Sequence, residues 1–423
     1  MKVMVVGGGG REHAIIKKLK ENKEITEIFA LPGNGGMKND ATLVNIGAKD
    51  IDAQVEFAKA NGIDYAVVAP DDPLVLGAVD ALTDAGIPCF GPNKAAAIIE
   101  GSKVFSKNLM KKYNIPTAQY EVFSNKEDAL KYLETAPIPT VIKADGLALG
   151  KGVIIAETRE EAKNAVISMM EDKIFGESGS NIVIEEFLTG PEVSVLSFTD
   201  GETVVPMVSS MDHKRALDGD KGLNTGGMGT VAPNPYYTEE IARECMEKIF
   251  IPTIKAMNSE NRTFKGCLYF GLMLTEKGPK VIEYNCRFGD PETQVVLPLM
   301  ESDLLTVMKA TTFGTLKDTP VKFRKGAAAC VIMASRGYPQ KYESGFELNI
   351  DPCVAHKVYV AGAKLDGDVL KTAGGRVLGV TDTGEDLKTA LNKAYENVKK
   401  VSFKNAFWRK DIGAKALKAI EEN

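Results

Sequence analysis

The sequence is poor in the residues that most metal and redox sites require. Among its 423 residues there are three histidines, too few for a histidine-rich metal site, and one tryptophan, most simply a packing residue. The six cysteines form no C-x-x-C pair and no zinc-site spacing. We therefore expect reduced core residues of a cytoplasmic protein at Cys89, Cys245, Cys267, Cys286, Cys330 and Cys353.

Long apolar runs and a strong charge of one sign are also missing. No run approaches the ~20 residues needed to span a membrane, and the sequence opens on an apolar strand pattern, 2–6, rather than on a signal peptide. The formal net charge of −5 argues against a general nucleic-acid binder. We expect a soluble protein without membrane or nucleic-acid partners, in which anionic substrates meet local basic residues.

The first hundred residues alternate short apolar strands with helical patterns. This alternation predicts a parallel sheet with helices on both faces, in which ligands bind beyond the carboxyl ends of the strands. The strands are expected at 2–6, 28–31, 65–69 and 87–90, and the rim beyond them should carry Gly9, Arg11, Gly35 and Asp71.

The glycine run at 7–10 leaves three interpretations open. A glycine loop between a strand and a helix suits an anion, but the dinucleotide pattern would place Glu12 or His13 where a small residue belongs. The next strand also ends in Pro32-Gly-Asn-Gly-Gly instead of the acid that holds a ribose. The loop could bind NAD, bind a small phosphate or sugar phosphate with help from Arg11, or be glycines that only allow close packing.

A second glycine-rich segment, 145–152, lies between the strands expected at 140–143 and 153–156. It carries Lys151, and Lys143 precedes it, so it could fold over phosphates as a lid. The Walker spacing is absent and no helix follows. The alternative is a plain hairpin with a charged tip.

The segment 281–294 has the pattern of a strand followed by a charged turn. Alternation along the strand is expected to put Val281 and Glu283 on one face, and Glu283 and Asn285 then direct their oxygens to one place. Such oxygen ligands suit Mg²⁺, usually with phosphates completing the shell. Arg287 and Asp290 follow. The simpler interpretation is a solvated, salt-bridged turn.

Two further segments are expected to be loops. Residues 70–73 look like a polar loop, and 212–229 is so polar and rich in glycine that we expect a structureless binding loop. His213 in this loop is interpreted as a hydrogen-bonding residue rather than a catalytic base, because no Ser, Cys or Asp partner is evident. A β-rich tail follows from Ala327.

Taken in order, these parts resemble the ATP-grasp superfamily and, within it, the phosphoribosylamine–glycine ligase (glycinamide ribonucleotide synthetase) family. The motifs that carry the resemblance span essentially the whole chain, at 7–13, 143–152, 212–215, 224–229, 285–292 and 374–379. The resemblance implies an α/β and α+β multidomain fold. Its parts would be a Rossmann-like substrate domain at 1–101, an ATP-grasp domain at 102–325 with a lid subdomain at about 119–188, and a β-rich C-terminal domain at 326–423.

The resemblance implies an ADP-forming ligase that joins glycine to 5-phosphoribosylamine through glycyl phosphate in purine biosynthesis. ATP would be the co-substrate and Mg²⁺ or Mn²⁺ the metal. The chain would act as a monomer or small homo-oligomer, with transient contact to the upstream amidotransferase.

The resemblance also implies roles for individual residues. ATP would be bound by Lys103, Lys143, Gly150, Lys151, Gly152, Glu185, Glu186, Leu188 and Glu192, and the metal by Glu283 and Asn285. The substrates would meet Gly9, Arg11, Asp71, Asp212, Lys214, Thr225, Gly226, Gly227, Arg287 and Asp290, of which Arg287 and Asp290, with Lys143, would be catalytic.

Two departures from the family pattern are visible. The strand 268–274 contains no third acidic metal ligand, and Asp71 stands where glutamate is expected. Other classes compete with the ligase. Another ATP-grasp purine enzyme or carboxylase is disfavoured by the 212–229 motifs, a non-catalytic nucleotide binder by the intact Lys151, Glu283 and Asn285, and a dehydrogenase by the N-terminal loop.

Overall fold

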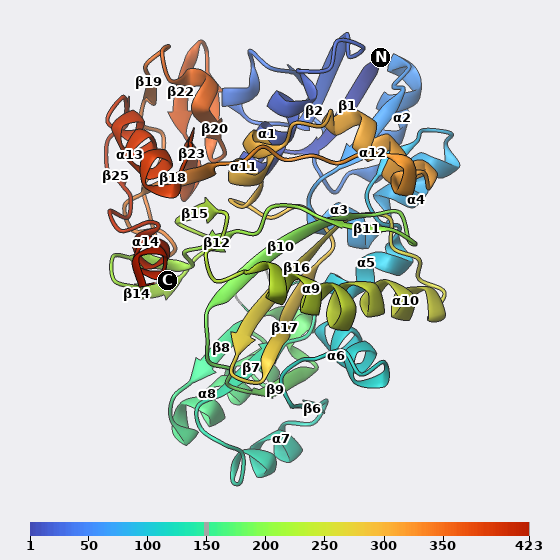
Figure 1. The fold of residues 1–423 in the computed structure, drawn as a ribbon, viewed down its shortest axis with the longest axis vertical. Helices are drawn as coiled ribbons and strands as arrows, with labels where there is room; N and C mark the ends of the chain where they lie inside the picture. The colour runs from blue at the N-terminus through green and yellow to red at the C-terminus, as the bar shows by residue number, and fades with distance from the viewer. Residues whose placement is uncertain (148–151, 423) are drawn as a thin grey trace.

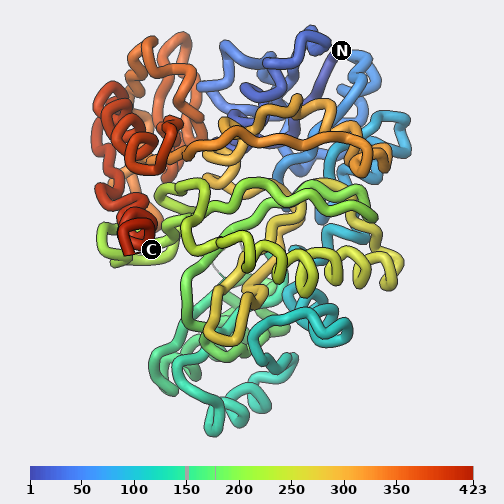
Figure 2. The backbone as a smooth tube through the Cα atoms, viewed as in Figure 1, coloured from blue at the N-terminus to red at the C-terminus, as the bar shows by residue number. Residues whose placement is uncertain are grey.

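The computed structural model describes residues 1–147 and 152–422 and arranges them around several sheets (Figure 1). The N-terminal part and the C-terminal part lie next to each other at the top of the view, and the segment around β6 to β9 forms the lower end. Figure 2 shows the middle of the chain, green to yellow, running between these upper and lower parts.

The N-terminal sheet has the parallel, helix-covered form expected from the alternating pattern. Its strand order is β3-β2-β1-β4-β5. The strands are β1 (Lys2–Gly7), β2 (Glu27–Pro32), β3 (Thr42–Leu43), β4 (Tyr65–Val68) and β5 (Cys89–Phe90). The helices are α1 (Gly10–Leu19), α2 (Ile51–Asn61), α3 (Asp71–Leu76), α4 (Ala78–Asp84) and α5 (Lys94–Gly101).

Two expectations for this part were wrong. Residues 70–73 are not a loop: helix α3 begins at Asp71, because two acids suit the positive end of the helix dipole and proline is tolerated in a first turn. Gly35 does not serve the ligand rim. A Cβ on it would lie 2.7 Å from Leu365 N and Leu370 Cδ1, so this glycine allows the C-terminal part to pack closely.

The lower end of the molecule is a small antiparallel sheet with helices of its own. Its order is β6-β9-β7-β8, and its hydrophobic cluster is separate from the others. The elements are β6 (Tyr120–Phe123), α7 (Lys126–Leu133), β7 (Thr140–Ala144), β8 (Val153–Ala156), α8 (Arg159–Met170) and β9 (Ile182–Glu186), and α6 (Lys103–Lys112) precedes them.

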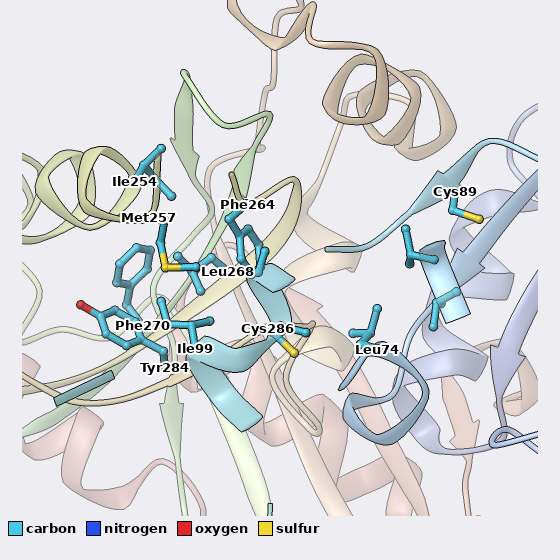
Figure 3. Close-up of a cluster of buried hydrophobic side chains, with 14 of the residues drawn as sticks. Leu74, Cys89, Ile99, Ile254, Met257, Phe264, Leu268, Phe270, Tyr284 and Cys286 are labelled. Atoms are coloured by element: carbon cyan, nitrogen blue, oxygen red, sulfur yellow. The ribbon is translucent and has the colours of Figure 1, made fainter. Parts of the chain in front are cut away.

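A second antiparallel sheet, ordered β11-β10-β16-β17, lies between the lower end and the N-terminal sheet. It comprises β10 (Glu192–Thr199), β11 (Val204–Pro206), β16 (Gly266–Thr275) and β17 (Gly278–Asn285), covered by α9 (Glu239–Cys245), a π-helical turn (Met246–Phe250) and α10 (Ile251–Ser259). Its core is continuous with that of the N-terminal part: Figure 3 shows Leu74 and Cys89 in one cluster with Met257, Leu268 and Phe270.

Strand β17 carries a bulge that overturns one expected alternation. Strand β16 pairs Leu272 with Val281 and Gly271 with Glu283, which leaves Ile282 as the extra residue. Val281 is therefore buried in the core, whereas Glu283 faces a cavity. The expected common face of Val281 and Glu283 was wrong.

The segment 212–229 is not structureless. It contains an antiparallel hairpin of β13 (Arg215–Leu217) and β14 (Lys221–Asn224), flanked by β12 (Met211–Asp212) and β15 (Gly229–Ala232). Strands β12 and β15 pair with each other, and β15 pairs with β18. The segment therefore begins and ends in the C-terminal sheet.

That sheet has the order β12-β15-β18-β23-β20, with β25 paired to β18. It is built from β18 (Ala327–Ser335), β20 (Val358–Val360), β23 (Arg376–Gly384) and β25 (Ala406–Phe407), and α13 (Leu387–Val398) packs on it. Two short ribbons, β19 (Asn349–Ile350) with β24 (Val401–Ser402) and β21 (Ala363–Asp366) with β22 (Val369–Thr372), and the helices α11 (Thr293–Val296), α12 (Leu304–Phe313) and α14 (Ala414–Glu422) complete the elements named here.

All six cysteines were expected to be core residues. Five cysteines are buried, but Cys353 is exposed, so the expectation of a core position was wrong for that residue. In the part of the chain that the structure describes, no helix has the length and apolar character needed to cross a membrane.

His213 fastens the 212–229 segment to the C-terminal part. Gly413 N donates to His213 Nε2 at 3.0 Å, so the ring proton is on Nδ1, which lies 2.9 Å from the Gly229 carbonyl oxygen. Burial lowers the pKa of His213 to about 4. The hydrogen-bonding role expected for this histidine fits these contacts.

This histidine should make the protein less stable in acid. His213 binds a proton with a pKa of ~6.5 in the unfolded state but only near 4 in the folded state. The contribution of the neutral histidine to stability is therefore complete above pH ~6.5 and is lost as the pH falls to 4, by roughly 3 kcal/mol. Between pH 7 and 4, we expect the free energy of unfolding of wild type to fall by this amount more than the free energy of unfolding of His213→Gln. Urea unfolding measures both. The exposed His356→Gln is the control. Equal pH slopes in wild type and His213→Gln would contradict the assignment.

Candidate active site

A cavity of about 840 Å³ lies where the two antiparallel sheets, helix α6 and the 212–229 segment meet. Most of the residues expected at a ligand site line it: Asp71, Lys103, Lys143, Gly152, Glu185, Glu186, Leu188, Glu192, Asp212, Lys214, Thr225, Gly226, Glu283, Asn285, Arg287 and Asp290. Segments far apart in the sequence therefore contribute to one site.

The other expected residues are either not among those that line the cavity or fall outside the described part of the chain. Gly150 and Lys151 fall outside the described residues. Gly9 and Arg11 are at the start of α1, beside Asp290: the Arg11 N–H donates to Asp290 Oδ2 at 3.4 Å, and a Cβ on Gly9 would lie 3.3 Å from the same oxygen. Gly227 lies directly behind the cavity wall, against Asp212 and Pro291.

At the end of the cavity formed by β7, β9 and α6, a buried carboxylate joins two lysines. Glu185 Oε2 lies 3.1 Å from both Lys107 Nζ and Lys143 Nζ. Lys143 also donates to the carbonyl oxygen of Ile282, the bulged residue, at 3.1 Å. Glu185 Oε1 is buried and has no hydrogen-bond partner among the described residues. An acceptor without a partner is costly when buried, so this oxygen is available to a ligand donor.

Lys103 lies at the opening of the glycine-rich segment. Its Nζ donates to the Gly146 carbonyl oxygen at 2.6 Å. Burial lowers the pKa of Lys103, although the Glu283 carboxylate opposes that shift. This lysine and Lys143 therefore bring two cations toward Glu283.

Two further acids expected at the nucleotide are engaged with lysines. Glu186 Oε1 pairs with Lys280 at 2.8 Å and accepts the Gln119 N–H at 3.1 Å. Glu192 pairs with Lys214 at 2.9 Å and raises the pKa of that lysine well above its usual range. The pairing also joins β10 to the 212–229 segment.

The oxygen donors on β17 fit a divalent cation of the Mg²⁺ type. Glu283 and Asn285 both line the cavity. Burial would raise the pKa of Glu283, but Lys214, Lys143 and Lys103 together hold it below its usual range, so the carboxylate is ionised. Among the described residues no group of three His, Cys, Asp or Glu could hold a metal. A cation here would have two protein oxygens and would take the rest from phosphates and water.

Arg287 is held by two carboxylates that come from different parts of the chain. Its Nη2 lies 3.0 Å from Glu100 Oε1 and 4.0 Å from Asp71 Oδ2. Burial would lower the pKa of Arg287, but Glu100 and Asp71 raise it. Its Nε is buried without a hydrogen-bond partner in the part of the chain described. One donor of a fixed cation is thus free for an anionic group.

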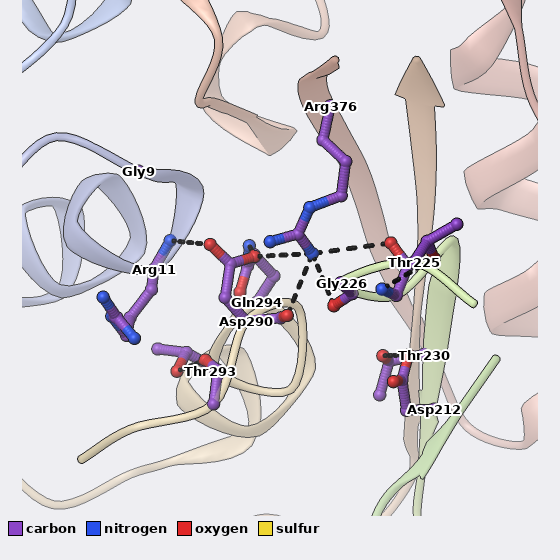
Figure 4. Close-up of polar contacts among 12 residues, drawn as sticks. Gly9, Arg11, Asp212, Thr225, Gly226, Thr230, Asp290, Thr293, Gln294 and Arg376 are labelled. Atoms are coloured by element: carbon purple, nitrogen blue, oxygen red, sulfur yellow. Dashed lines mark hydrogen bonds and ion pairs between the residues drawn. The ribbon is translucent and has the colours of Figure 1, made fainter. Parts of the chain in front are cut away.

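Asp290 connects three segments of the molecule (Figure 4). Besides the Arg11 N–H, it accepts Gln294 Nε2 at 2.8 Å, and Arg376 Nη1 lies 3.5 Å from its Oδ1. Burial would raise the pKa of Asp290, but Arg376 and Arg11 hold it below its usual value. This acid is therefore an ionised group at the cavity wall.

A second kind of acid lines the same end of the cavity. Burial raises the pKa of Glu292, and burial together with Glu292 raises the pKa of Asp212 well above its usual range. Ser194 Oγ donates to Glu292 at 3.4 Å, and Tyr269 OH lies 2.7 Å from that Ser194 oxygen. A buried carboxyl whose pKa is raised by a neighbouring acid favours a cation or a shared proton.

Sequence reasoning missed Glu100, Lys107 and Glu292, which line the cavity, and Arg376, which lies behind its wall. Glu292 and Arg376 lie inside motifs that it singled out, so their charge was a usable signal. Glu100 and Lys107 sit on helical patterns, where a charged residue is usually solvated. Only the fold shows that they are 9% and 2% exposed.

Comparison with known families gives a match for each part of the chain. The N domain of phosphoribosylglycinamide synthetase matches residues 1–100, its ATP-grasp (A) domain 101–293 and its C domain 328–415. The three matches follow one another in the order of that family and cover most of the sequence.

Curated relatives match over almost their whole length. A protein of Clostridium acetobutylicum named phosphoribosylamine–glycine ligase is 46% identical, over 98% of this chain and 99% of its own. One of the same name from Rhodopirellula baltica is 48% identical, over 98% of each chain.

Solved structures show the same fold. The crystal structure of phosphoribosylamine–glycine ligase from Thermotoga maritima covers 97% of this chain, is itself covered completely, and has 35% identity and a TM-score of 0.87. A second solved structure is the biotin carboxylase domain of 2-oxoglutarate carboxylase from Hydrogenobacter thermophilus. It has 16% identity and a TM-score of 0.72, and the match covers 96% of this chain and 91% of that one. At this identity the likeness shows a shared fold alone. From the family matches and the relatives at 46% identity, the chain belongs to the phosphoribosylglycinamide synthetase family.

Proposed function

We propose that this protein ligates glycine to 5-phosphoribosylamine, with ATP converted to ADP and phosphate, in purine biosynthesis. The observation that carries the proposal is the full-length relationship to proteins named phosphoribosylamine–glycine ligase. The cavity supports it, because lysines, arginines and acids from all parts of the fold line one space. No nucleophilic side chain is needed, since positioning and charge neutralisation suffice for phosphoryl transfer.

In the proposed first step, a carboxylate oxygen of glycine attacks the γ-phosphorus of ATP, the bond to the β,γ-bridging oxygen breaks, and ADP leaves. Negative charge accumulates on the transferred group, so fixed cations favour the step. We assign Lys103 and Lys143 to the phosphates of ATP. Arg287, whose buried Nε has no hydrogen-bond partner among the described residues, is assigned to the acyl phosphate.

In the proposed second step, the amine nitrogen of phosphoribosylamine attacks the carbonyl carbon of glycyl phosphate. The C–O bond to phosphate breaks, phosphate departs with the electron pair, and the departing phosphate takes up the proton that the nitrogen gives up. We assign Asp290 to the amine, because it is an ionised acid close to Arg287 in sequence and shares the cavity wall with it.

The finer parts of this proposal concern the metal, the assembly and the compartment. We assign Glu283 and Asn285 to Mg²⁺ or Mn²⁺, which when bound would neutralise charge on the phosphates. We further propose a monomer or small homo-oligomer in the cytoplasm that receives its unstable amine by transient contact with an amidotransferase.

A carboxylase that forms carboxyphosphate is the second candidate, because biotin carboxylase domains share the fold. Glycine dependence separates the two. We expect ADP release by the purified protein to require glycine and phosphoribosylamine, formed in situ from ribose 5-phosphate and ammonia, and not bicarbonate. Coupled-enzyme detection of ADP with each substrate omitted in turn is the measurement. Turnover that persists without glycine would overturn the ligase assignment.

The assignment of Glu283 to the metal predicts the effect of replacing one of its carboxylate oxygens. Glu283→Gln keeps the size of the side chain but removes the charge that faces three lysines, so kcat should fall by at least ~100-fold, the scale of losing one electrostatic stabiliser. The same assay, with Mg²⁺ titrated, measures this.

Glu276→Gln, at an exposed position of the β16–β17 turn, is the matched control and should behave as wild type. If Glu283→Gln kept near-normal kcat and the wild-type Mg²⁺ dependence, the ligand assignment would be wrong.

A further inference from the structure

The backbone N–H and the carbonyl oxygen of Gly226 are both held by side chains of the C-terminal part. Its N–H donates to Tyr338 OH at 3.0 Å, and its carbonyl oxygen accepts Arg376 Nη1 at 2.8 Å. Figure 4 shows Arg376 extending from its strand to the turn that contains Thr225 and Gly226. Both of those residues line the cavity.

The same guanidinium nitrogen also holds the segment of Asp290. Arg376 Nη1 donates to the Asp290 carbonyl oxygen at 2.9 Å and to the Gly227 carbonyl oxygen at 3.4 Å, and it lies 3.5 Å from Asp290 Oδ1. One cation therefore ties the 225–227 turn to the acid that follows Arg287. Arg376 lies behind this wall and is not among the described residues that line the cavity.

The turn has no room for other side chains at this contact. A Cβ on Gly226 would lie 2.9 Å from Arg376 Cζ. Gly227 has φ +115°, and a Cβ on it would lie 2.6 Å from Asp212 Oδ1. The glycines thus let the turn pack directly on the guanidinium face and on Asp212.

We propose that Arg376 is a positioning residue for the half of the cavity that takes the amino acid and the amine. It fixes the distance between the 225–227 turn and Asp290, and it leaves the nucleotide half, with Lys143 and Glu185, unaffected. The proposal rests on the proposed function for its kinetic tests, whereas hydrogen exchange tests it without turnover.

Removal of the side chain should separate the two halves of the site. We expect Arg376→Ala to lower kcat/KM for glycine by about 100-fold, the cost of misplacing reacting groups. The Kd of a non-hydrolysable ATP analogue should stay within about twofold, as for independent sites. Guanidinium ion at millimolar concentration should restore part of the activity, whereas sodium chloride of equal ionic strength should not. Arg336→Ala, an exposed position of the same C-terminal part, is the control and should behave as wild type.

The contact can also be broken from the opposite side. Gly226→Ala would place a methyl group against the guanidinium of Arg376. The guanidinium can move away at little cost to the backbone, and the contact would then be lost, so this substitution should lower kcat/KM for glycine by a similar factor. Both substitutions disrupt the same contact. In the double variant kcat/KM for glycine should therefore fall by about 100-fold, rather than by the product of the two single losses.

Hydrogen exchange tests the same contact without catalysis. In Arg376→Ala the backbone amides of 224–229 should exchange at least about tenfold faster, while those of β9 stay unchanged. A wild type that lacks glycine-dependent turnover would overturn the proposed function alone. Three outcomes would overturn the role of Arg376. They are amide exchange at the wild-type rate in Arg376→Ala, a loss of kcat/KM below about threefold, and an equal loss of ATP-analogue affinity that guanidinium does not rescue.

Discussion

The contact of Glu185 with Lys107 and Lys143 shows the constraint on which the site depends. Cations that are to meet phosphates must stay charged while buried, and burial alone favours the neutral lysine. One carboxylate shared by two lysines keeps both in place. Glu283 near Lys214, Lys143 and Lys103, and Arg287 beside Glu100, repeat this pairing of buried cations with an acid.

This constraint explains why the cavity draws on so many parts of the fold. Adjacent side chains of a strand point to opposite faces, and the cation and the acid of each pair described here come from different elements. Lys107 on α6 meets Glu185 on β9, and Arg287 after β17 meets Glu100 on α5. The core shared by the N-terminal part and the second antiparallel sheet holds these elements in fixed relative positions.

The resemblance to the ligase family implied most of the residues that gather at the cavity. Periodicity, which is local, predicted the parallel N-terminal sheet and most strand positions. It failed where geometry depends on the partner strand. The bulge at Ile282 exists only through pairing with β16, and the β13–β14 hairpin only through pairing within a polar segment. Gly35 was assigned to a ligand because nothing local shows that a C-terminal strand packs on it. For the same reason a buried Glu100 cannot be told from a solvated one by spacing.

The pairing of β12 with β15 has a consequence for how this protein can diverge. Asp212 and Thr230 are register partners, so the ends of the intervening segment are joined by the C-terminal sheet whatever lies between them. The entropy of closing such a loop grows only slowly with its length. The length of the intervening hairpin can therefore change at a small entropic cost, provided that Lys214 and the 225–227 turn keep their contacts with Glu192 and Arg376.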